Sequence, residues 1–97
     1  MPKLLTDVEI HDRLADLPDW QRDGNSIRRT VKARDFRTAI AIVNDVAERA
    51  EQANHHPDID IRWRTVHFVL STHSEGGITE ADFGLAREID AAVAAHT

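Results

Sequence analysis

The chain has 97 residues, a length that fits one domain with a modest core, so we expect a single domain over residues 1–97. Its formal net charge is −5 and its basic residues are scattered, which disfavours direct binding of nucleic acid. No apolar run approaches the roughly 18 residues of a membrane span, and Asp7 and Glu9 interrupt the region where a signal peptide would be apolar. Because there is also no cysteine for a disulfide or a thiolate site, the composition predicts a cytoplasmic soluble protein.

The first predicted element is a helix over residues 6–17. Thr6 is a suitable N-cap for this helix, and Glu9, three residues later, completes a capping box. A β-hairpin is expected over residues 20–31, because the Asp-Gly-Asn sequence at 23–25 is a strong turn signal and residues of strand type alternate after it.

A long second helix is predicted from the N-cap Asp35 to about Ala53. Its apolar residues form two neighbouring rows at steps of three and four residues. The first row is Phe36, Ile40, Val43, Ala47 and Ala50, and the second is Ile42, Val46 and Ala53. Two rows side by side could cover both the sheet and a partner subunit, or they could both face the core. Periodicity alone favours the core.

The sequence Asn-His-His-Pro at 54–57 ends the long helix, because a proline disfavours helical geometry in the residue before it. Two half-buried strands are expected next, over residues 58–63 and 66–73. After a Gly-Gly loop, Thr79 with Asp82 predicts a capping box at the start of the last helix.

The resulting order of elements is α-β-β-α-β-β-α with short connections. Strands in hairpin pairs, separated by helices, are typical of an antiparallel sheet with helices packed on one face. We therefore expect an α+β fold with two layers.

Four of the six histidines lie between Glu51 and Asp82. His55 and His56 follow the C-terminal end of the long helix, where the helix dipole favours the protonated imidazolium. His73 lies at the end of the last predicted strand. If the strands over residues 58–63 and 66–73 pair as a hairpin, His73 at the end of the second strand returns to the start of the first. That position lies beside His55 and His56.

Three interpretations of these histidines compete. A zinc site is one, but the spacing lacks the tight H-E-x-x-H pattern, and adjacent histidines rarely bind one ion. The second interpretation is that the histidines are ordinary polar residues. We prefer it for His67, a single histidine on a strand face that is partly exposed to solvent. The third is general acid–base catalysis without a metal, which imidazole supports because its pKa lies close to neutrality. For His55, His56 and His73 we prefer this third interpretation, because sites often form where such helix and strand ends meet loops.

The spacing of these residues resembles the signature of a known family. Glu51, the His55-His56-Pro57 sequence, Trp63, His73 and Asp82 stand at the intervals found in the pterin-4a-carbinolamine dehydratases. The sequences at 70–73 and 76–80 also resemble this family, and the resemblance covers nearly the whole chain. It implies a small α+β domain with a four-stranded antiparallel sheet.

The resemblance also implies an activity. Members of the family dehydrate 4a-hydroxytetrahydrobiopterin to quinonoid dihydrobiopterin without a metal or cofactor, which recycles the pterin that aromatic amino acid hydroxylases use. It implies that the chain forms a homodimer or homotetramer and is linked to such a hydroxylase. The alternative is a non-catalytic dimerisation or regulatory module with the same fold, as some relatives have become.

The site residues implied by the resemblance fall into three groups. The catalytic set is His55, His56 and His73, with His56 as the principal acid/base; the residues that hold the pterin are Asn54, Ser71, Thr72 and Glu51; and the supporting residues are Asp82, Pro57 and Trp63. Two of these assignments keep an alternative. Asp82 could only cap its helix, and Glu51 could be a solvated residue of the last helical turn.

Overall fold

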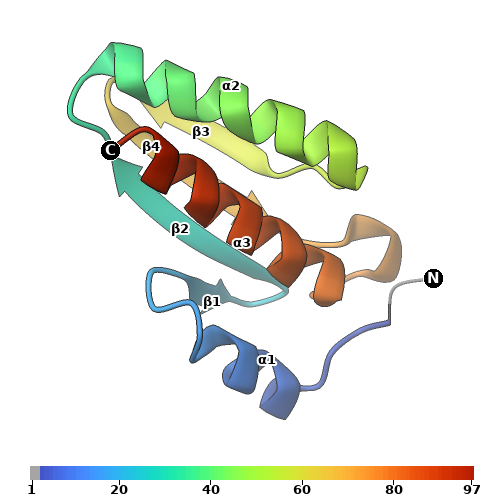
Figure 1. Cartoon of the computed structure of the whole chain (residues 1–97). Coiled ribbons are helices and arrows are strands. Elements are labelled where there is room, and N and C mark those ends of the chain that lie inside the picture. Colours follow the sequence, from blue (N-terminus) through green and yellow to red (C-terminus); the bar gives the residue numbers. More distant parts are fainter. Residues whose placement is uncertain (1–2) are drawn as a thin grey trace.

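The computed structural model describes residues 3–97 as a four-stranded antiparallel sheet with two long helices across one face (Figure 1). The sheet order is β1-β2-β4-β3, and every neighbouring pair is antiparallel. The elements in chain order are α1 (Asp7–Leu14), β1 (Gln21–Asp23), β2 (Ser26–Lys32), α2 (Phe36–Ala53), β3 (Asp58–Arg62), β4 (Thr65–Leu70), the short 3₁₀ helix η1 (His73–Glu75) and α3 (Glu80–Ala95). The predicted fold class is confirmed.

The core lies between the sheet and the helices α2 and α3. Alternate residues of β2 and β4 point towards the helices, since side chains along a strand change face at every residue. These buried positions, with the α3 side chains that meet them, are Ile27, Val31, Val66, Phe68, Leu70, Phe83, Leu85 and Ile89. Trp20, just before β1, is also buried, and its indole Nε1 donates to Asp90 of α3 at 2.8 Å. Hence the first hairpin is fastened to the last helix.

The predicted capping boxes are confirmed at both α1 and α3. At α1 the Thr6 side chain accepts from Glu9 N, and the Glu9 side chain accepts from Thr6 N. The helix ends at Leu14, however, and not at residue 17 as predicted. Its last turns tighten, because the N–H of Leu17 bonds to the carbonyl of Leu14, three residues back.

The two apolar rows of α2 have different environments. Ile42 and Val46 of the second row are buried, as are Ala39 and, from the first row, Ala50, whereas Ala53 at the end of the second row is exposed. The rest of the first row faces outwards: Phe36 is 50% exposed, Ile40 and Val43 are half-buried, and Ala47 is exposed. The expectation that the whole width faces the core was wrong, because the apolar arc is wider than one sheet contact can cover.

The strand predicted over 58–63 is an edge strand and is less buried than expected. It pairs only with β4, so Ile59 remains 36% exposed, although it sits opposite the buried Phe68. The strand predicted over 66–73 ends at Leu70. Beyond it only Thr72 makes a strand-like bridge, to Gly77, and His73 belongs to η1.

None of the helices formed by residues 3–97 combines the length and the apolar character needed to cross a bilayer.

Candidate active site

The C-terminal end of α2 presents His55 and His56 in a fixed turn. Asn54 has the left-handed backbone conformation, with φ 49° and ψ 41°. The N–H of Asn54 bonds to the Glu51 carbonyl at 3.2 Å, and the N–H of His55 bonds to the Ala50 carbonyl at 3.1 Å. These two bonds form a Schellman motif, for which asparagine is the usual substitute for glycine. The turn therefore directs the chain from the helix end straight into the two histidines.

His55 is paired with a buried carboxylate. Its Nε2 lies 2.6 Å from Asp82 Oδ1 in the first turn of α3. The Asp82 side chain is fully buried, and that of His55 is 16% exposed. The other oxygen, Asp82 Oδ2, accepts from the Thr72 hydroxyl and from the Thr79 backbone N–H, both at 2.9 Å. Both roles proposed for Asp82 are thus found together, since one oxygen caps α3 and the other supports the histidine.

The hydrogen bonds around Asp82 fix the orientation of the His55 ring. A carboxylate can only accept, so the hydrogen between His55 and Asp82 belongs to Nε2. Thr72 gives its single hydroxyl proton to Asp82, so the 2.7 Å contact between Thr72 and Thr79 uses the Thr79 proton. The groups around Asp82 therefore orient the His55 ring, with Nε2 directed at the carboxylate and Nδ1 on the other side of the ring.

His56 has a more open environment. Its Nε2 forms a hydrogen bond to Glu51 Oε2, from the last turn of α2. The side chains of this pair are 55% and 72% exposed, so both groups remain accessible to a ligand. The two adjacent histidines thus each have a carboxylate, one buried and one exposed to solvent.

His73 lies on the loop that closes the same end of the sheet. It follows Thr72 directly, which places it next to the group that holds Asp82. The loop is closed by the bridge between Thr72 and Gly77, with the Thr72 N–H bonded to the Gly77 carbonyl at 2.8 Å. Within it Gly76 takes a positive φ of 75°. The His73 side chain is exposed, on the segment that joins the end of β4 to α3.

Four other predicted site residues have positions that bear on their roles. Ser71 donates its hydroxyl to the carbonyl of Asn25, which fastens the end of β4 to the first hairpin. Thr72 is only 5% exposed and its hydroxyl is taken by Asp82, so it lies beneath the site as a support and not in contact with solvent. Pro57 sits between His56 and β3. Trp63 lies in the β3–β4 turn, at the far end of β3 from Pro57, so it does not join the histidines.

Two features of the site were not anticipated from sequence. Thr79 was predicted only as a helix cap, but it is fully buried and holds Asp82 through its N–H. A groove of about 430 Å³ beside His55 runs between α2 and α3, and its lining is Arg49, Gln52, Ala53, His55, Ala81, Gly84, Leu85 and Glu88. The groove forms because α2 and α3 pack side by side in the folded protein, so no local sequence signal could have revealed it.

Arg49 is the permanent positive charge in that groove. Its guanidinium donates to Asp45 at 2.9 Å and to Glu88 at 3.0 Å. These hydrogen bonds, that of Asp45 first, raise the pKa of Arg49 above its already high ordinary value. The groove therefore has one fixed cation, held in place by two carboxylates.

Within residues 3–97 no three histidine, aspartate or glutamate side chains gather closely enough to hold a metal ion. The arrangement at the end of the sheet is one of imidazole–carboxylate pairs, which is suited to proton transfer.

A family model described as pterin 4 alpha carbinolamine dehydratase matches residues 3–92. A curated relative from Nocardia farcinica is 62% identical over 88 residues, which are 91% of this chain and 93% of that protein. One from Roseiflexus castenholzii is 57% identical over 90 residues, 93% of this chain and 97% of that protein. Both are named pterin-4-alpha-carbinolamine dehydratase, and in both the name is provisional. The fold and the site define a small α+β domain with an imidazole–carboxylate centre, and the chain belongs to the pterin-4a-carbinolamine dehydratase family.

Solved structures agree with this assignment. The crystal structure of a protein from Brucella melitensis, described as a transcriptional coactivator/pterin dehydratase, superposes with a TM-score of 0.91 at 35% identity. The match covers 94% of this chain and 99% of the other. A pterin dehydratase-like protein described as a RuBisCO assembly factor of the alpha-carboxysome has a TM-score of 0.63 at 20% identity, over 76% of this chain and 86% of that one. This second likeness shows the shared fold alone.

Proposed function

We propose that the protein catalyses the dehydration of 4a-hydroxytetrahydrobiopterin to quinonoid dihydrobiopterin and water. An acid protonates the hydroxyl group on C4a, which leaves as water. A base removes the proton of the neighbouring ring N–H, and the electron pair of that N–H bond forms the new C=N bond. The product has lost one water and the enzyme regains its starting protonation state when the base returns the proton to the acid.

The observation that carries this proposal is the pairing of His55 with the buried Asp82 at the same end of the sheet as His56 and His73. An acid–base reaction needs groups that exchange protons near neutral pH and keep a fixed orientation. The carboxylate beneath His55 supplies the orientation. The open pair of His56 and Glu51 leaves His56 accessible to substrate, which suits it to be the principal acid/base.

In this mechanism His55 and His73 bind the departing hydroxyl and share in the proton transfer. The accessible nitrogen of His55 is Nδ1, because Nε2 donates to Asp82. Asn54, Ser71 and Glu51 are the residues proposed to hold the pterin, with Thr72 acting from beneath through Asp82. No metal or cofactor takes part in this proposal, and the product, quinonoid dihydrobiopterin, serves an aromatic amino acid hydroxylase in the cytoplasm only after a separate reductase has reduced it to tetrahydrobiopterin.

The decisive experiment follows carbinolamine decay by stopped-flow absorbance, with and without the protein. His56→Ala should lower kcat by about 10²–10⁴-fold, the usual contribution of a general acid or base. His67→Ala is the matched control, because His67 lies on the outer sheet face and contacts Thr30. Circular dichroism should show an intact fold in both variants.

An unchanged rate in His56→Ala would remove this residue from the mechanism. Decay no faster with the wild-type protein than without it would remove the reaction itself. Loss of activity in a chelator would contradict the metal-free mechanism.

The second candidate is partner binding, as a module that assembles with itself or with another protein. It is supported by the apolar row of α2 that faces outwards, which begins with Phe36 and Ile40. The Brucella melitensis relative is described as a transcriptional coactivator as well as a pterin dehydratase. We propose a homodimer or homotetramer that buries this row. Light scattering should show a larger species for the wild type and a monomer for Ile40→Asp, and a wild-type monomer would contradict the assembly.

A further inference from the structure

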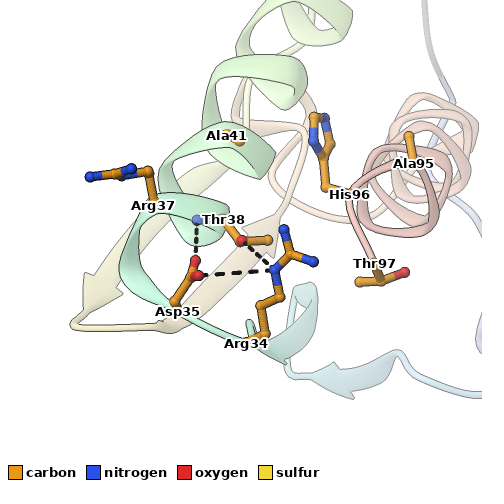
Figure 2. Close-up of a pocket in the computed structure, with 8 residues that line it drawn as sticks. All are labelled: Arg34, Asp35, Arg37, Thr38, Ala41, Ala95, His96 and Thr97. Carbon is orange, nitrogen blue, oxygen red and sulfur yellow. Dashed lines mark hydrogen bonds and ion pairs between the residues drawn. The ribbon is translucent and has the colours of Figure 1, made fainter.

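A second hollow lies at the opposite end of the helical layer, where α2 begins and α3 ends (Figure 2). Its volume is about 580 Å³, and its lining is Arg34, Asp35, Arg37, Thr38, Ala41, Ala95, His96 and Thr97. A neighbouring hollow of about 450 Å³ shares Arg34, His96 and Thr97 and adds Lys32, Ala33 and Arg64. Because the two hollows share these three residues, they form the lobes of one cavity, the basic cavity.

The basic cavity concentrates positive charge in an acidic protein. Four of its lining residues, Lys32, Arg34, Arg37 and Arg64, carry permanent positive charges, and Asp35 is the one lining residue with a carboxylate side chain. In Figure 2 the Arg37 side chain points away from His96, on the other side of α2. The whole chain has a net charge of −5. A local excess of cations against that background attracts anions to this place.

Two of these four cations make no contact that the fold uses. Among residues 3–97, Lys32 and Arg37 form no side-chain hydrogen bond or ion pair, and Nε of Arg64 is buried without a partner. Arg34 donates to the Thr38 hydroxyl at 3.2 Å and lies 3.9 Å from Asp35, which holds its guanidinium at the cavity wall. Arg64 already donates through Nη1 to the Arg34 carbonyl at 3.2 Å and lies over the Trp63 ring, so Lys32 and Arg37 are the cations of the cavity that are left for a ligand.

The backbone at this end of α2 also favours an anion. Asp35 accepts from the N–H of Thr38 at 2.7 Å. The N–H groups of Phe36 and Arg37, in the same first turn, have no acceptor within the helix, and the positive end of the helix dipole lies here. The opposite wall is fixed, since His96 Nε2 is bonded to Asp45 of α2 at 3.1 Å.

We propose that the basic cavity binds a small molecule through a phosphate or diphosphate group. Arginine forks and helix N-termini both suit phosphate oxygens. Each lobe falls within the roughly 300–1,000 Å³ of ordinary small-molecule pockets, which favours a compact ligand over an extended polymer.

This site is distinct from the histidine site. The two lie at opposite ends of α2, whose 18 residues span about 27 Å at about 1.5 Å per residue. Figure 1 shows the C-terminus beside the start of α2, with β3 beginning near the other end of that helix. A ligand in the basic cavity therefore cannot touch His55, His56 or His73, and its binding can be tested independently of catalysis.

The test titrates ¹⁵N-labelled protein with inorganic pyrophosphate and, in parallel, with inorganic phosphate, recording amide shifts by NMR. The largest shifts should fall on residues 36–38. Arg34→Gln/Arg37→Gln should weaken binding at least about 10-fold. Arg28→Gln/Arg87→Gln changes the net charge equally away from the cavity, and its affinity should stay that of the wild type. Lys32→Gln/Arg37→Gln repeats the test at two side chains that form no hydrogen bond or ion pair within residues 3–97.

Equal weakening in the cavity and control variants would reduce the effect to general charge and overturn the proposal. So would shifts centred on residues 55–56, or no shifts with either anion at millimolar concentration. A polyglutamate peptide that binds with the same variant dependence, while pyrophosphate does not, would assign the cavity to an acidic protein segment and also overturn it.

Discussion

The two ends of α2 use their polar groups in different ways. At the C-terminal end His55 and His56 each have a carboxylate, and Asp82 accepts three hydrogen bonds. At the N-terminal end, cations such as Lys32 and Arg37 have no side-chain partner within residues 3–97. Groups that satisfy one another are positioned for chemistry, whereas groups left unsatisfied are available to a ligand. The C-terminal end of α2 thus carries a preorganised site, and the N-terminal end carries cations that are available to a ligand.

The largest expected effect tests how tightly the C-terminal end is organised. Asp82→Ala should lower the free energy of unfolding by about 3–5 kcal/mol, because a buried charged acceptor is removed from donors that stay buried. Urea unfolding followed by circular dichroism measures this. Glu51→Ala is the matched control, since it removes the exposed histidine partner and should change stability by less than about 0.5 kcal/mol. Similar losses in both would show that burial does not distinguish the two pairs.

A smaller effect concerns the turn that presents the histidines. Asn54→Val should destabilise the fold by about 1–2 kcal/mol, because a β-branched residue is strained in the left-handed conformation. Asn54→Gly should stay within a few tenths of a kcal/mol of the wild type, since glycine is the commonest residue at this position. Thermal unfolding of the three proteins gives the comparison. A stable Asn54→Val protein would mean that the turn changes conformation easily.

The smallest effect belongs to the N-terminal end and depends on pH. The hydrogen bonds from Thr38, side chain first and then backbone, lower the pKa of Asp35. The charged cap is therefore fully stabilising above the unfolded pKa of about 3.9, and this contribution is lost as pH falls through the lower folded value.

Asp35→Asn keeps a good N-cap but cannot titrate. Between about pH 5 and pH 2 the wild type should lose slightly more stability than this variant, measured by urea midpoints at each pH. Parallel pH profiles would show that the cap does not depend on the charge of Asp35.

Local signals predicted most of the fold. The capping boxes at Thr6 and Thr79, the Asp-Gly-Asn turn and the N-cap Asp35 act within a few residues, so the sequence contains all that they need. The errors concern tertiary environment. Neither the row of α2 that faces outwards nor the edge position of β3 can be read from periodicity, which counts apolar residues but does not show how many partners are there to cover them.

The candidate site divides in the same way. The convergence of the C-terminal end of α2 with the end of β4 follows from the hairpin connection, and the link from His55 through Asp82 to Thr72 bears it out. The burial of Thr72 and the position of Trp63 could not be predicted. A spacing pattern gives residue numbers but not depth, and the strand that carries the chain to Trp63 leads away from the histidines.

The two tryptophans give this protein a built-in optical probe of its own unfolding. Trp20 is 4% exposed and hydrogen-bonded to α3, whereas Trp63 is 71% exposed, with the Arg64 guanidinium carbon 5.0 Å from its ring centroid. Acrylamide should quench the emission of Trp63 long before that of Trp20. Trp63→Phe would then leave a fluorescence signal that reports only whether the first hairpin still packs on the last helix.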